Sequence, residues 1–303
     1  MTTTDQDLSA ALVTWDLEPL LPAPGDEGID RLLDEAESLV AECEAWRGRI
    51  DGIDAGDLAD LVGTLARIGD LVGRAESHAG LAFAADTTDP ALGARMQRVD
   101  EVATRLGTRL LFFELEWAAL DSETAEGLLA DERLASARHH LRSVRRYRPH
   151  LLSEPEEIIH SEKSLTGRSA WQRLFEEQVS AIEVEIGGEP TTLEAALGRL
   201  HSPERDLRQQ AAAAVTRALE PGLRTRTFIF NTLLADKAVD DRLRAYPSWI
   251  ASRNLANEAS DASVDALVAA VRARYSIPQR WYTLKARLLG VDRLADYDRM
   301  ASV

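Results

Sequence analysis

Glu157 and His160 have the spacing of a metal-binding pair. They are three residues apart, which is the Glu-x-x-His pattern from which di-iron sites in helical bundles are built. Residues three apart share one face of a helix, so both side chains could reach the same ion. A di-iron site also requires a second such pair, and the sequence contains no other Glu-x-x-His. We therefore interpret this segment as a solvated helix start that carries a surface histidine.

A dense basic cluster precedes this pair. Arginine offers a planar fork of donors, so the cluster could bind a carboxylate such as the C-terminus of a peptide. The alternative is that its arginines pair with acidic residues of neighbouring helices, and we favour it because 51 acidic residues face 35 basic ones. The members of the cluster are Arg138, His139, His140, Arg142, Arg145, Arg146, Arg148 and His150.

The common catalytic motifs are absent from the sequence. There is no phosphate-binding Gly-Lys pair, no G-x-S-x-G and no G-x-G-x-x-G, and none of the six histidines is followed by glutamate, which excludes H-E-x-x-H. Cys43 is the single cysteine, so an internal disulfide is impossible. The polar segment Ser161–Ser169 resembles a ligand loop, but a connection between two helices explains it equally well. From the residues alone, we assign no catalytic or metal-ligating residue, and substrate-binding residues remain unknown.

Composition narrows the class of protein. The 303 residues are 45% apolar, enough for one large helical domain or two domains. The net charge of −16 argues against binding to nucleic acids or to anionic membranes. The N-terminus lacks the basic and apolar stretches of a signal peptide, and no apolar run approaches the ~20 residues of a membrane span. We therefore expect a soluble, cytoplasmic protein.

Apolar periodicity predicts helices over most of the chain. Three buried stripes, over 29–50, 58–75 and 92–113, are expected to pack as antiparallel neighbours, the third beginning at Asp89-Pro90. One or two helices are expected over 124–147. A further helix should begin at a capping box formed by Ser153 and Glu156, and a short helix should follow over 171–179. Six tryptophans are expected to anchor the core: Trp15, Trp46, Trp117, Trp171, Trp249 and Trp281.

One segment breaks the helical pattern. Ile182, Val184 and Ile186 alternate with polar or small residues, and Gly187-Gly188 follows, which predicts a strand and a tight turn. A second capping box is expected at Thr191–Glu194, and helices should resume after Ser202-Pro203. Breaks are expected at Pro221-Gly222, at Pro247 and near Pro278, and a helix end at Gly290. The predicted fold is mainly α, with one small β-hairpin near residues 180–192.

Several segments resemble the oligoendopeptidase F type of M3 zinc metallopeptidases. Trp15-Asp16-Leu17 is similar to the opening of those proteins. The stretch YRPHLLSEPEEIIHSEKSLTGRSAWQRLFEE, residues 147–177, resembles the family pattern R-x-x-x-P-(H/Y)-x-L-S-x-x-E-E followed by T-G-x-x-A-W-x-x-L-F. Further segments resemble the family in the same order along the chain. They are the predicted strand and glycine turn, then RLRAYPSWIASRNLANE, then YTLKARLLGVDRLADYDRM. The resemblance spans nearly the whole chain and is strongest from Tyr147 onward.

The resemblance implies a mostly helical, oligopeptidase-like architecture with a channel that admits short unfolded peptides. In the family, one zinc ion is held by the two histidines of H-E-x-x-H and a downstream glutamate. The glutamate of the motif activates the water that attacks the peptide carbonyl. This motif lies C-terminal to the segment that resembles Leu294–Val303, so no catalytic residue or zinc ligand can be carried over. Ala301-Ser302-Val303 also differs slightly from the Ala-Pro-hydrophobic usual there.

The resemblance also implies a domain organisation. We expect an antiparallel helical region over 1–114, an oligoendopeptidase F-like N-terminal domain over 115–183, and the first part of the catalytic domain, without its zinc site, over 200–303. The chain is then expected to be a fragment that binds no zinc by itself and on which a C-terminal catalytic half packs. The alternative is a non-catalytic helical module that binds peptides or a partner subunit.

Overall fold

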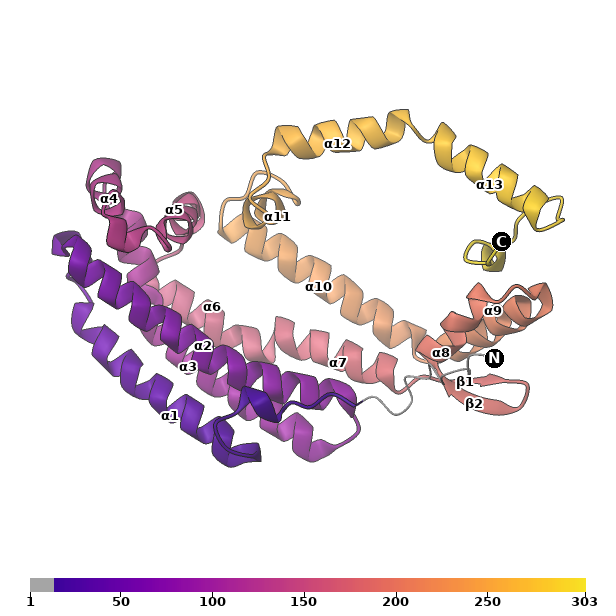
Figure 1. Cartoon of the computed structure of the whole chain (residues 1–303), viewed down its shortest axis with the longest axis horizontal. Helices are drawn as coiled ribbons and strands as arrows, with labels where there is room; N and C mark the ends of the chain where they lie inside the picture. Colours follow the sequence, from indigo (N-terminus) through magenta and orange to yellow (C-terminus); the bar gives the residue numbers. More distant parts are fainter. Residues whose placement is uncertain (1–13) are drawn as a thin grey trace, which may run out of the picture. The chain divides into compact units, whose positions relative to one another are not determined.

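The structure is a computed structural model that describes residues 14–303. It divides into two compact units, one ending at Leu141 and one beginning at Arg142. Both are built mainly from helices, and a single two-stranded hairpin lies in the second unit (Figure 1). The predicted fold class is confirmed. Within the described residues, no helix is both long and apolar enough to cross a membrane.

Three long helices form the core of the first unit. They are α1 (Gly25–Cys43), α2 (Ala55–Ala85) and α3 (Pro90–Ala119), and each contacts the other two (Figure 1). The buried side chains are those of the predicted stripes, among them Ile29, Leu71 and Val99. Asp89 caps α3 as expected, since its carboxylate accepts a 2.7 Å hydrogen bond from the Ala91 amide.

Shorter elements complete this unit. Helix α4 (Ser122–Leu129) lies in this unit, and the division at Leu141 falls within helix α5 (Arg138–Arg146); both helices occupy the stretch in which one or two helices were predicted. Trp117 of α3 is completely buried, and its indole Nε1 donates a 2.8 Å hydrogen bond to the Leu141 carbonyl. A 3₁₀ turn over Glu18–Leu20 precedes α1, and further 3₁₀ turns over Glu44–Trp46, Ile50–Gly52 and Glu132–Leu134 lie between the helices.

The second unit opens with two helices that meet at a single residue. After a 3₁₀ turn over Arg148–His150, α6 spans Glu154–Thr166 and α7 spans Arg168–Ser180. The Glu156 carboxylate accepts a 3.0 Å hydrogen bond from the Ser153 amide, as the predicted capping box requires. The prediction that Ser161–Ser169 forms a loop between helices is wrong, because all of it is helical except Gly167. Helix α6 runs on because its polar side chains fit a solvated helix face.

The predicted hairpin is present. Strand β1 (Glu183–Ile186) pairs antiparallel with β2 (Glu189–Thr192), with Glu183 opposite Thr192. Gly187 and Gly188 have φ of +67° and +87°, the left-handed backbone that such a two-residue turn needs. Helix α8 (Leu193–Gly198) follows, and Thr192 rather than Thr191 caps it, because pairing in the hairpin continues to Thr192.

The hairpin packs on helix α9 and forms a small core with it. Helix α9 spans Arg205–Leu219, and a 3₁₀ turn over Arg199–His201 joins it to α8. The buried members of this core are Val184, Ile186, Leu193, Ala196, Ala211, Ala214 and Val215. Further along, a 3₁₀ turn over Asp296–Asp298 also contacts α9.

Four further helices extend from α9. They are α10 (Leu223–Leu243), α11 (Ala251–Ala256), α12 (Asp261–Ala273) and α13 (Ser276–Leu288). The break expected near Pro278 lies at Arg274–Tyr275, because proline fits the first turn of a helix and Pro278 occupies that position in α13. Gly290, with φ of +67°, ends the helical segment as predicted.

These helices expose many apolar side chains. No residue of α12 is buried, and α13 buries Lys285 and Ala286. The prediction that all six tryptophans are core anchors is correct for Trp117 and wrong for Trp15, Trp249 and Trp281, whose exposed fractions are 74%, 75% and 46%. Exposed apolar residues from α10 onward include Leu223, Phe228, Phe230, Leu234, Trp249, Leu267, Val271, Ile277, Trp281, Leu284 and Leu288. An apolar helix face of this extent normally packs on a partner surface.

Candidate functional site

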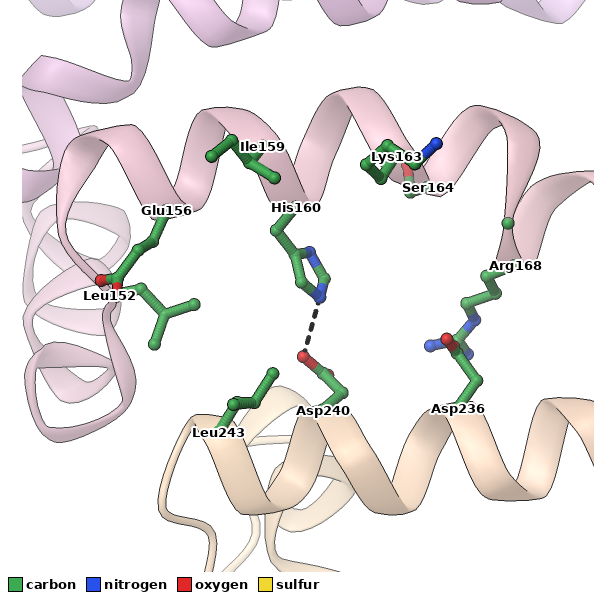
Figure 2. A pocket seen from close by; sticks show the side chains of 11 residues that line it. Leu152, Glu156, Ile159, His160, Lys163, Ser164, Arg168, Asp236, Asp240 and Leu243 are labelled. Atoms are coloured by element: carbon green, nitrogen blue, oxygen red, sulfur yellow. Dashed lines mark ion pairs between the residues drawn. The ribbon is translucent and has the colours of Figure 1, made fainter.

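A cavity of about 380 Å³ lies between α6 and α10 in the second unit. One wall comes from α6 and the start of α7, and the other from α10 (Figure 2). The cavity is lined by Leu152, Glu156, Ile159, His160, Lys163, Ser164, Gly167, Arg168, Asp236, Asp240 and Leu243. Such a mixture of apolar walls and a few convergent polar groups is typical of binding sites for small molecules.

An ion pair crosses the middle of this cavity. The Nε2 atom of His160 lies 3.0 Å from Oδ1 of Asp240, so the side chains join α6 to α10 (Figure 2). The same Asp240 oxygen accepts a hydrogen bond of 3.0 Å from Nε of Arg244, one turn further along α10. Asp240 is therefore fixed in position by two donors.

A nearly buried carboxylate lies next to this pair. Glu157 receives two parallel hydrogen bonds of 2.8 Å from Arg244 and one of 2.9 Å from the Leu152 amide. Burial by itself would raise the pKa of Glu157, but the hydrogen bonds from Arg244 and Leu152 outweigh it and lower that pKa. The same pairing raises the pKa of Arg244. Both groups are therefore charged at neutral pH.

His150 holds the end of α10 from the other side. Its Nδ1 donates to the Arg244 carbonyl at 2.8 Å, and Arg244 donates back to the His150 carbonyl at 3.2 Å. The imidazole also stacks on Tyr246 with 3.9 Å between ring centroids. Burial raises the pKa of the Tyr246 hydroxyl, which stays neutral. Together these contacts fix the start of α6 against the end of α10.

The structure separates the Glu-x-x-His pair that the sequence singled out. Glu157 bonds to Arg244 while His160 bonds to Asp240, so the two side chains have different partners. The interpretation of a solvated helix start is wrong for Glu157, which is buried, because α10 packs over it and supplies its counter-charge. It is correct for His160, whose side chain is 40% exposed.

Replacing Glu157 with glutamine tests this network. The variant keeps the shape but removes the charge that faces Arg244, so we expect a loss of about 2 kcal/mol of unfolding free energy at pH 7. Since the pKa of Glu157 is lowered in the folded state, its contribution is present at neutral pH and disappears as the pH falls through that lowered value. Urea unfolding of both proteins at pH 7 and pH 3 should therefore show a difference that shrinks in acid. An equal difference at both pH values would contradict this assignment.

The basic cluster is used for structural contacts where its partners are defined. Arg138 donates to the Leu129 carbonyl at 2.7 Å and pairs with Glu132 at 3.7 Å. His150 bonds to Arg244, as described above. These contacts agree with the favoured interpretation, pairing within the protein, and give no support to a carboxylate-binding cluster.

The described residues do not form a metal site. Over residues 14–303, no three His, Cys, Asp or Glu side chains are close enough to hold one ion. Cys43 is buried in the first unit, where burial raises its pKa to about 11, so it is a neutral thiol at pH 7. The residues present therefore do not fit a zinc ion, and we derive no catalytic step through one.

Sequence reasoning missed the α10 half of this site. Asp236, Asp240 and Arg244 follow one another at intervals of four residues, so they share one face of α10. That spacing was a usable signal of a charged helix face. It did not identify Glu157 and His160, about 80 to 90 residues earlier, as the partners of that face.

Residues 116–183 match the family model described as Oligopeptidase F. No curated protein matches the chain. Among solved structures, oligoendopeptidase-F from Enterococcus faecium matches with a TM-score of 0.79 at 20% identity, over 92% of this chain and 56% of that chain. A proposed oligoendopeptidase F from Bacillus anthracis str. Ames matches with a TM-score of 0.63 at 16% identity, over 92% of this chain and 48% of that chain. A proposed peptidase from Chlamydophila abortus matches with a TM-score of 0.61 at 18% identity, over 95% of this chain and 49% of that chain.

These matches agree with the resemblance that the sequence motifs indicated. The chain has the fold of the oligoendopeptidase F structures and spans about half of their length. The predicted resemblance to the N-terminal part of an oligoendopeptidase F is confirmed, through the family model over residues 116–183 and through the fold over most of the chain.

Proposed function

We propose that this chain is the N-terminal part of a zinc-dependent oligoendopeptidase that hydrolyses short unfolded peptides. The observation that carries this proposal is the combined match: residues 116–183 to the oligopeptidase F family, and 92% of the chain to the fold of an oligoendopeptidase-F. In this proposal the zinc ligands and the general base belong to a C-terminal catalytic half. Solved structures of oligoendopeptidase F that share this fold over about half of their length support it.

The exposed helices give this catalytic half a surface on which to pack. Helix α12 buries none of its side chains, although Leu267, Val268 and Val271 recur on it at helical spacing. Trp281, Leu284 and Leu288 are exposed along α13 in the same way. Covering such faces with the catalytic half would remove apolar surface from water, at roughly 25 cal/mol per Å². Helices α10 to α13 would then form one wall of the peptide channel.

Chelation of the complete protein tests the proposed chemistry. We expect the complete protein to cleave short peptides, to lose that activity with a zinc chelator, and to recover it when zinc is added back. The 303-residue chain serves as the control, because it lacks H-E-x-x-H and no metal cluster occurs among its described residues. We expect it to show neither activity nor stoichiometric zinc by elemental analysis. Cleavage that persists after complete removal of zinc would contradict the mechanism, and one zinc per 303-residue chain would contradict the division between the two halves.

A non-catalytic binding module is the second candidate. It is favoured by the same absence of metal ligands within residues 14–303. As a module, the 303-residue chain should unfold cooperatively in solution by itself and capture a definite partner or peptide. As part of a peptidase, it should self-associate through the apolar helix faces that lack their partner, and the catalytic half should suppress that association.

A further inference from the structure

The exposed face of α13 has the residue spacing of a coiled-coil seam. Ile277, Trp281, Leu284 and Leu288 follow one another at intervals of four, three and four residues. That is the d-a-d-a order of a heptad repeat, which aligns the four side chains in one stripe along the helix. Each of them is 46% to 58% exposed, so the residues that the structure describes leave this stripe uncovered.

Two arginines flank the stripe on one side. Arg280 and Arg287 occupy the g positions of the same repeat, and both are exposed. Neither forms an ion pair with any residue between 14 and 303. On the opposite flank, at an e position, Lys285 is buried and donates a 2.9 Å hydrogen bond to the Arg299 carbonyl. The open flank of the seam is therefore positively charged.

Unpaired arginines of this kind stand out in an acidic protein. The chain has 51 acidic and 35 basic residues, yet residues 266–291 contain five basic residues and no acidic one. In the basic cluster before α6, by contrast, Arg138 pairs with Glu132. Solvation explains a single exposed arginine. Two of them at the flanking positions of an uncovered apolar seam indicate instead a partner that supplies the counter-charges.

We propose that α13 binds an amphipathic helix whose apolar seam is flanked by glutamate or aspartate. Burial of the two seams would drive the association, and carboxylates opposite Arg280 and Arg287 would select the partner and fix its register. The source of this helix rests on the proposed function: in the complete peptidase it belongs to the catalytic half. Lys285 holds Arg299 against α13, so residues that continued beyond Val303 would begin close to this helix.

A pair of synthetic helices tests the proposal on the 303-residue chain. Both are three heptads long with leucine at every a and d position, and they differ only in having glutamate or lysine at every e and g position. In about 0.05 M NaCl we expect the glutamate peptide to bind roughly tenfold or more tightly than the lysine peptide, as measured by fluorescence anisotropy of the labelled peptides. In about 0.5 M NaCl the difference should shrink, because salt screens exposed charges. The net charge of −16 favours the lysine peptide, so the opposite preference reports the local arginines.

Variants separate the charges from the seam. The double variant Arg280→Gln, Arg287→Gln should lose the preference for the glutamate peptide. Leu284→Gln should weaken the binding of both peptides, because it places a polar group in the seam. The matched control is Arg199→Gln, Arg217→Gln, which removes two exposed arginines from α9 and the turn before it and should leave the preference unchanged. All the substituted residues are exposed, and circular dichroism checks that each variant keeps its fold.

Four results would overturn the proposal. They are no binding of the glutamate peptide at about 1 mM, equal or tighter binding of the lysine peptide, an unchanged preference in the Arg280 and Arg287 double variant, and tighter binding to phosphatidylserine vesicles than to the glutamate peptide. The last result would assign the arginines to a membrane surface. Zinc-dependent cleavage by the complete protein is measured separately, so a failure of peptide binding would refute this inference and leave the proposed function standing.

Discussion

Replacing Asp298 with alanine is expected to lower the free energy of unfolding by about 4 kcal/mol. Asp298 is completely buried in the 3₁₀ turn that contacts α9. Its carboxylate accepts three hydrogen bonds, of 2.8 Å from Arg208, 3.0 Å from Arg205 and 2.8 Å from the Ala295 amide. Arg208 is 1% exposed, and its Nε atom already lacks a hydrogen-bond partner. Removing the carboxylate would leave that buried guanidinium without a counter-charge, held only by the carbonyls of Ser202 and Pro203.

The two arginines should differ in importance. Arg205 is 43% exposed, so water can replace its contact with Asp298, and Arg205→Ala should cost about 1 kcal/mol or less. Arg208→Ala should also be destabilising, but less than Asp298→Ala, because Asp298 would keep its hydrogen bonds from Arg205 and the Ala295 amide. Asp296→Ala is the matched control, since Asp296 is exposed in the same turn and should change stability by less than about 0.5 kcal/mol. Urea unfolding followed by circular dichroism measures all four variants.

Acid should weaken this contact in a defined range of pH. Burial opposes the ionisation of Asp298, but hydrogen bonds from Arg205, Arg208 and the Ala295 amide outweigh it and lower its pKa from 3.8 to about 2. Because the folded pKa is the lower one, the stabilisation is present above about pH 4 and disappears as the pH falls toward 2. The stability difference between the unaltered chain and Asp298→Ala should shrink over that range. A large difference at pH 7 that persists unchanged at pH 2 would show that packing, not charge, explains the loss.

Trp117→Ala is expected to destabilise the first unit by about 4 kcal/mol. Trp117 is fully buried in α3, and truncation leaves a cavity that the surrounding helices fill incompletely. The substitution also removes the 2.8 Å hydrogen bond to the Leu141 carbonyl, which ties α3 to α5. Trp117→Phe, which keeps an aromatic ring, should cost less.

Trp15→Ala is the matched control for this experiment. It removes the same side chain from the same unit, at a position that is 74% exposed, and should change stability by less than about 0.5 kcal/mol. Far-UV circular dichroism is the suitable probe, because tryptophan fluorescence changes with the substitutions themselves. Equal losses for Trp15→Ala and Trp117→Ala would mean that burial in the structure does not decide which tryptophan holds the first unit together.

Local patterns predicted most of the elements. Asp89-Pro90 placed the start of α3, Ser153 with Glu156 placed the start of α6, and Gly187-Gly188 placed the hairpin turn. These signals succeed because a cap or a turn depends on residues within four positions of one another. Where two neighbouring residues competed, as at Thr191 and Thr192, strand pairing decided which became the cap.

Contacts between distant segments were not predictable in the same way. The sequence does not show that Glu157 meets Arg244, or that Asp298 meets Arg208, because helix packing decides which faces meet. The tryptophans illustrate the same limit, since Trp117 and Trp249 are alike in type while one is buried and the other is 75% exposed. A side chain's burial depends on what covers it.

The sequence by itself determined the mainly α fold, the hairpin, the capped starts of α3 and α6 and the resemblance to oligoendopeptidase F, because periodicity, caps and motif order are local properties of the chain. The tertiary structure alone decided that Glu157 is a buried structural carboxylate rather than half of a metal pair. It also decided that α6 and α10 enclose a cavity that the His160–Asp240 pair crosses. The physical reason is that a charge takes its role from the groups that packing brings within a few ångströms, and here those groups come from helices far apart in sequence.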